Sequence, residues 1–117
     1  MLKKIEGRYN RGAQVQAFKE ELERMITEYG WQDKAVHPYS YPMPLTTILG
    51  YLKDYDRCTS GSRDYIISLA NGLAGILNAW EEYEKAPKIA VRMIKTGKIA
   101  HILESDLDMF EGVAERI

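Results

Sequence analysis

The side chains best suited to chemistry are six glutamates in two groups, which fall in two predicted helices: Glu20, Glu21 and Glu23, then Glu81, Glu82 and Glu84. Carboxylates three residues apart on facing helices can hold Mg²⁺ for the hydrolysis of a nucleotide. The second acidic pair that this chemistry requires is missing, because Glu104 and Asp108 are four residues apart. A metal-dependent nucleotide hydrolase is therefore the weakest of three functional hypotheses.

The other residue types that serve in catalysis are isolated from one another. His37 and His101 are far apart in sequence, which is not the spacing of a metal site. Cys58 is the only cysteine, so it can form neither an internal disulfide nor a cysteine-based zinc site. Neither histidine has a serine or cysteine near it that would suggest a nucleophile and its base. We therefore expect a protein that is not an enzyme and that binds no metal or cofactor.

A run of positive charge is the most suggestive binding feature. Five basic residues fall between Lys85 and Lys98 with no acidic residue among them. On a helix, four of them would form a basic strip able to contact phosphates or an acidic protein surface: Lys88, Arg92, Lys95 and Lys98. Lys85 and Lys88 each follow a glutamate by four residues, which favours a merely solvated surface there. A nucleic-acid-associated accessory subunit is the second hypothesis.

Residues 31 to 44 form a segment rich in proline and aromatic residues. Three prolines push the residues before them towards extended geometry, so the segment cannot be helical. At fourteen residues it is long for a connection in a compact domain, and such loops either pack across a helix or bind a partner. The partner-binding candidates are Trp31, His37, Tyr39 and Tyr41. For Trp31 and Tyr39 we favour the alternative that they cover the core.

A stripe of small residues follows one side of the longest predicted helix: Ser68, Gly72, Gly75 and Ala79. Each glycine costs a helix about 1 kcal/mol relative to alanine, so close approach of another helix is expected to compensate. That helix could belong to the same chain, which we favour, or to a second copy in a homodimer.

These side chains are expected to be positioned by helices. Apolar residues with helical spacing predict helices over residues 13–29, 45–56 and 63–85, with Gly30 ending the first. The predicted apolar stripe of the first helix is Val15, Phe18, Leu22, Met25 and Tyr29, and that of the third is Ile66, Leu69, Leu73, Ile76, Trp80 and Tyr83. The same spacing predicts helical segments over 87–103 and over 105–117, the latter capped by Ser105. Residues 1–12 are ambiguous, since Leu2 and Ile5 could pack on the bundle or the segment could be a mobile arm. The expected fold is all-α, a single compact bundle of four to five helices over residues 1–117, with a long loop between the first two.

Composition limits the remaining choices. The chain has 117 residues, 45% apolar and 28% charged, which is typical of one globular domain. Its net charge of −1 excludes a generally basic nucleic-acid binder. No apolar run approaches the ~20 residues of a membrane span, and the start lacks the apolar stretch of a signal peptide, so we expect a cytoplasmic protein. The first hypothesis is a small non-catalytic adaptor, inhibitor or accessory subunit that binds a protein partner, of a kind common among phage and mobile-element proteins.

Overall fold

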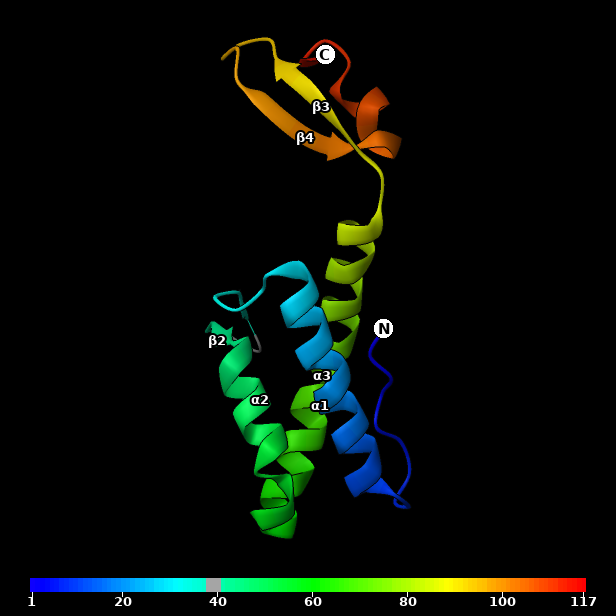
Figure 1. Cartoon of the computed structure of the whole chain (residues 1–117), viewed down its shortest axis with the longest axis vertical. Helices are drawn as coiled ribbons and strands as arrows, with labels where there is room; N and C mark the ends of the chain where they lie inside the picture. The colour runs from blue at the N-terminus through cyan, green and yellow to red at the C-terminus, as the bar shows by residue number, and fades with distance from the viewer. Residues whose placement is uncertain (38–40) are drawn as a thin grey trace. The chain divides into compact units, whose positions relative to one another are not determined.

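The computed structural model of the chain describes residues 1–37 and 41–117, and the chain divides into two compact units (Figure 1). Unit 1 is Met1–Glu81 and unit 2 is Glu82–Ile117. Unit 1 is largely helical, whereas unit 2 is built on a three-stranded antiparallel sheet. The prediction of an all-α bundle of four to five helices is therefore wrong, since the chain combines α-helices with β-strands. Among the described residues, no helix is both long and apolar enough to cross a membrane.

The elements of unit 1 surround most of the buried apolar side chains. In chain order they are α1 (Arg11–Tyr29), β1 (Ala35–Val36), β2 (Met43–Pro44), α2 (Leu45–Lys53), the short 3₁₀ helix η1 (Tyr55–Arg57) and α3 (Ser60–Lys85), whose last turn belongs to unit 2. Leu2 and Ile5 are each 4% exposed, so the N-terminal segment packs against this core. Of the two alternatives for the N-terminal segment, a packed segment and a mobile arm, the structure therefore shows the packed one.

The first helix is confirmed. Its predicted apolar positions Val15, Phe18, Leu22 and Met25 are all buried, as their 3-4 spacing requires. Gly30 adopts a left-handed φ of 70° and its N–H donates to the carbonyl of Ile26, which ends the helix.

The proline-rich segment, residues 31–44, contains a small two-stranded antiparallel hairpin. β1 and β2 pair antiparallel, with Val36 opposite Met43 and Ala35 opposite Pro44. Val36 and Met43 are 2% and 5% exposed, so this pair covers the core of unit 1. Its central residues 38–40 lie outside the described residues.

The third helix is confirmed, but its buried side differs from the predicted stripe. Ile66, Leu69 and Leu73 are buried as expected, whereas Ile76 is 42% exposed. Leu77 is buried instead. Seven residues fall slightly short of two full helical turns, so the side of α3 that contacts the core shifts gradually along the helix.

Unit 2 contains the sheet and one 3₁₀ helix. Its elements are β3 (Lys88–Met93), β4 (Ile99–Leu103), η2 (Glu104–Phe110) and β5 (Ala114–Arg116), and the strand order is β4-β3-β5 with both pairings antiparallel. The helices predicted over 87–103 and 105–117 are therefore wrong. Gly97 and Gly112 adopt left-handed φ values of 70° and 80°, which form turns where those helices would have continued.

Candidate functional site

The register of unit 2 places a set of exposed side chains on one face of its sheet. Arg92 in β3 lies directly opposite Ile99 in β4 and opposite Glu115 in β5. The N–H of Ile94 donates to the carbonyl of Val113 at 2.9 Å, which continues the β3–β5 pairing past the strand ends. Because strand side chains alternate between faces, Ile94 and Val113 lie on the same face as Arg92.

The same reasoning extends to the other end of β5. The N–H of Ile117 donates to the carbonyl of Ala90 at 3.3 Å, so Ile117 also lies on the face of Arg92. We call this surface the open face, and its exposed members are Arg92, Ile94, Ile99, His101, Val113, Glu115 and Ile117. Its four large apolar side chains are between 50% and 63% exposed. The open face therefore combines an apolar surface with one arginine, one glutamate and one histidine.

The opposite face of the sheet is the covered one. Val91 is 0% exposed, and Ile89, Met93 and Ile102 on the same face are half-buried. Leu107 of η2, a helix that contacts β4, is half-buried as well. The two faces of this sheet thus differ, and the apolar side chains of the open face have no such cover in unit 2.

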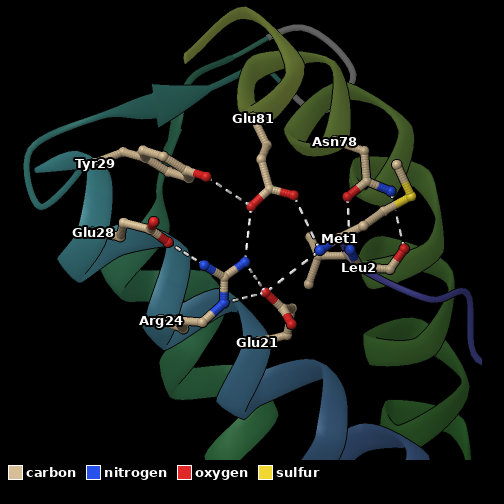
Figure 2. Close-up of polar contacts among 8 residues, drawn as sticks. All are labelled: Met1, Leu2, Glu21, Arg24, Glu28, Tyr29, Asn78 and Glu81. Carbon is tan, nitrogen blue, oxygen red and sulfur yellow. Dashed lines mark hydrogen bonds and ion pairs between the residues drawn. The ribbon is translucent and has the colours of Figure 1, made fainter. Parts of the chain in front are cut away.

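In unit 1 the carboxylate of Glu81 is 2% exposed. Figure 2 shows the groups that surround it. Arg24 Nη2 donates to Glu81 Oε2 at 2.8 Å, and the hydroxyl of Tyr29 donates to the same oxygen at 3.1 Å. The N-terminal amine of Met1 lies 3.0 Å from Glu81 Oε1. Arg24 also forms ion pairs with Glu21 and Glu28 of α1.

These partners change how the groups of the cluster ionise. Burial raises the pKa of Glu81, but the hydrogen bonds from the amine, from Arg24 and from Tyr29 outweigh it, and the pKa falls to about 2. The pKa of Tyr29 is raised by burial and by its hydrogen bond to Glu81. The guanidinium of Arg24 is held charged by Glu21 and Glu81, which raise its pKa further.

The glutamates considered for a metal site are therefore only partly brought together. Glu21 of α1 and Glu81 of α3 do approach a common point, but Arg24 lies between them and supplies the positive charge. Across residues 1–37 and 41–117, no group of three acidic, histidine or cysteine side chains is arranged to hold a metal ion. His37 and His101 are exposed in different units, and the thiol of Cys58 donates to the carbonyl of Asp54 at 3.1 Å.

The predicted basic strip is dispersed, because its residues form a strand and a turn rather than a helix. The ammonium of Lys88 donates to the carbonyls of Tyr83, Glu84 and Ala86 at 2.5, 3.3 and 3.4 Å. It also lies 4.4 Å from the centre of the Tyr83 ring. Lys88 thus satisfies two carbonyls in the last turn of α3 and the carbonyl of Ala86 just after it, which is a structural role.

The three remaining cations of that strip are exposed and fall within seven residues of sequence. Arg92 is exposed near the end of β3, and Lys95 and Lys98 are exposed in the turn between β3 and β4. Together they place positive charge around one end of the β3–β4 hairpin.

The candidate residues of the proline-rich segment have separate environments. Trp31 is 3% exposed and contacts Tyr29 and Trp80, with ring centres 5.1 and 5.5 Å away. The ammonium of Lys34 lies 4.6 Å from the Trp80 ring. Trp31 is therefore a core residue, in line with the alternative that we favoured for it.

The other three candidates of this segment are not brought into that cluster. His37 is exposed and Tyr41 is 54% exposed. Tyr39 lies outside the described residues.

The small stripe on α3 faces solvent. Ser68, Gly72, Gly75 and Ala79 are all exposed, and a Cβ atom added at either glycine would meet no atom within 4 Å outside its own helical turn. The favoured explanation, close packing of another helix of the same chain, does not occur within the described residues. A homodimer through this stripe stays a prediction.

Ile99, Val113 and Ile117 were missed because they were assigned to predicted helices. Two signals in the sequence point to strands instead: the alternation of Ile89, Val91 and Met93, and the Thr-Gly pair at residues 96–97.

Comparison of the chain with protein-family models, curated proteins and solved structures finds no match.

Proposed function

We propose that this protein is a non-catalytic adaptor or accessory subunit, which binds a protein partner through the open face of unit 2. The observation that carries this proposal is the exposure of Ile94, Ile99, Val113 and Ile117 on a single face of one sheet. Several large apolar side chains exposed on one face of a small sheet are typical of a protein-binding site. Arg92 at the centre of the face, between Ile99 and Glu115, is a residue type enriched in such interfaces.

The small core of unit 2 supports the same proposal. Unit 2 spans only 36 residues, and Val91 is its one fully buried apolar side chain. Domains below about 40 residues usually need a disulfide, a metal ion or association with another chain to remain folded. The single cysteine, Cys58, lies in unit 1, so a disulfide within unit 2 is not available. Burial of the open face against a partner would supply the missing apolar contacts.

The proposal is tested by placing a charge on the open face. Wild-type protein, Ile99→Glu and the matched control Met109→Glu are used to capture partners from a lysate of the native host, with and without nuclease. Met109 is 79% exposed in η2 and is not a member of the open face, so its substitution adds the same charge elsewhere. The captured partner is then purified and its affinity measured with each form.

We expect Ile99→Glu to weaken the purified complex by at least about tenfold, because a central apolar contact contributes 1–2 kcal/mol or more. Met109→Glu should bind as the wild type does. Equal affinity of all three forms would reject the open face as the site. Loss of the captured material after nuclease treatment would favour nucleic acid over a protein.

A second candidate function is the binding of nucleic acid by the cations around the β3–β4 turn. The observation in its favour is that Arg92, Lys95 and Lys98 are all exposed within seven residues of sequence. Arg92, however, lies opposite Glu115, which lowers the positive potential at that position. Protein binding is therefore the proposal that we place first.

A further inference from the structure

Three side-chain carboxamides hold the main chain of the N-terminal segment. Asn78 accepts from the N–H of Leu2 at 2.7 Å and donates to its carbonyl at 2.9 Å, as Figure 2 shows. Asn71 makes the same pair of hydrogen bonds with Ile5, at 2.8 and 2.9 Å. On α1, Gln14 does so with Glu6, at 2.9 and 2.8 Å. Each carboxamide thus satisfies both main-chain groups of one residue.

The two asparagines are spaced to match an extended chain. Asn71 and Asn78 are seven residues apart, which is about 10.5 Å along a helix. Leu2 and Ile5 are three residues apart, which spans about 9–10 Å in an extended chain. Asn78 contacts the earlier residue and Asn71 the later one, so the segment runs antiparallel to α3. This agreement in length allows both carboxamides to be satisfied at once.

The side chains of the segment add a simple selectivity. Leu2 and Ile5 are each 4% exposed and belong to the core of unit 1, whereas Lys3 and Lys4 between them are exposed. A carboxamide offers one donor group and one acceptor, which any residue other than proline can match. The three carboxamides therefore contact the main chain at positions 2, 5 and 6. Large aliphatic side chains are selected only at positions 2 and 5, where the side chains are buried.

The segment is held in a way that permits exchange. Residues 1–6 belong to no helix or strand, and the six hydrogen bonds described above all go to side chains. The segment joins α1 through Gly7 and Asn10, which both adopt left-handed φ values of 71° and 55°. Departure of residues 1–6 breaks no backbone ladder, although it takes the amine of Met1 away from Glu81. Another extended chain could make the same six hydrogen bonds.

We propose that the surface formed by Asn71, Asn78 and Gln14 is a binding site for an extended peptide of a protein partner, with residues 2–6 as its internal occupant. The peptide has two large aliphatic residues separated by two others, without proline at the positions that the carboxamides contact. The tethered segment competes with it at a high effective concentration, so the partner peptide binds when its concentration or affinity exceeds that of the tethered segment. This site lies in unit 1 and does not depend on the open face of unit 2.

The test uses a synthetic peptide with the sequence of residues 1–8 and a free amino terminus, which can also pair with Glu81 as the amine of Met1 does. The peptide is added to the full-length chain labelled with ¹⁵N. We expect the amide signals of Leu2, Ile5 and Glu6 of the protein to move to random-coil positions as the peptide displaces them. The variant Ile5→Ala, in which the internal occupant has lost one apolar contact, should bind the peptide about tenfold more tightly than the wild type.

The control peptide carries N-methyl groups at the amides of Leu2 and Ile5, which removes the two N–H donors and leaves both side chains. It should bind at least about tenfold more weakly, since two hydrogen bonds are lost. Equal binding of the two peptides, or no displacement by either one, would overturn the proposal. A wild-type dimer that exchanges residues 1–6, and that becomes monomeric in Ile5→Ala, would also overturn it, because the occupant would then be a second copy of this chain.

Discussion

Arg24 on α1 donates a hydrogen bond of 2.8 Å to the buried carboxylate of Glu81 on α3, and so joins two helices through residues that are 57 positions apart in sequence. Glu81 is the only buried charged side chain among the described residues. Its charge is offset by Arg24, by the hydroxyl of Tyr29 and by the amine of Met1. The pair therefore fixes how α1 and α3 meet in unit 1.

Glu81→Gln should lower the free energy of unfolding at pH 7 by about 2 kcal/mol, since a charge-assisted hydrogen-bond network is lost. The folded-state pKa of Glu81 is about 2 and its ordinary value is 4.5, so the unfolded chain binds the proton more readily. The stabilisation is present above pH 4.5 and is lost as the pH falls towards 2. Urea unfolding at several pH values checks this, and the difference between wild type and variant should shrink on acidification. The exposed neighbour Glu82→Gln serves as the control and should show no such trend.

Gly72→Ala and Gly75→Ala should each stabilise a monomeric protein by up to about 1 kcal/mol. Both glycines are in the middle of α3, and an added Cβ meets no atom within 4 Å. Thermal unfolding of the single and double variants measures the gain. If the stripe instead forms a tight homodimer, the same substitutions should lower stability and reduce the dimer fraction in sedimentation experiments.

Lys88→Met should weaken the end of α3 and the start of β3. The methionine keeps the apolar stem but cannot donate to the carbonyls of Tyr83, Glu84 and Ala86. We expect a loss of about 1 kcal/mol and faster amide hydrogen exchange in β3. Lys95→Met, an exposed position in the next turn, is the matched control. Unchanged exchange in Lys88→Met would show that the lysine contributes nothing at this helix end.

Lys95→Ala/Lys98→Ala decides whether the cations around the β3–β4 turn serve nucleic-acid binding. If they do, affinity for a single-stranded oligonucleotide should fall steeply with salt in the wild type. The double variant should bind more weakly and with a salt slope reduced by about 1.4, which is about 0.7 for each lost cation on a single strand. Fluorescence anisotropy at 50–200 mM salt would measure both quantities. The absence of wild-type binding at low salt would remove this candidate function.

The helices of unit 1 were predictable because each carries a long periodic pattern. Val15, Phe18, Leu22 and Met25 specify α1, and Gly30 specifies its end. The burial of Glu81 was not predictable from such a pattern. A glutamate on a helix indicates a solvent-facing position, and the approach of Arg24 and Tyr29 from α1 and of the amine of Met1 reverses that expectation.

The strands of unit 2 were mistaken for helices because short apolar runs fit both periods. Ile89 and Met93 are four residues apart, which suits one helical face, yet with Val91 they also alternate as in a strand. The open face depends on which strand positions lie opposite each other, such as Arg92 and Glu115. That register is set by pairing between distant segments, so local sequence patterns do not contain it. The spacing of Asn71 and Asn78 in the mainly apolar middle of α3 was visible in the sequence. Its meaning became clear only with the position of the N-terminal segment.

The small core of unit 2, in which Val91 is the one fully buried apolar side chain, also bears on how long the protein survives in a cell. A small unit with little buried apolar surface opens more often than a well-packed one, and proteases cut the opened form. A copy without its partner should therefore be trimmed first within Glu82–Ile117, leaving unit 1 intact. A partner that covers the open face would slow this degradation, so the abundance of the full-length protein would follow the abundance of its partner.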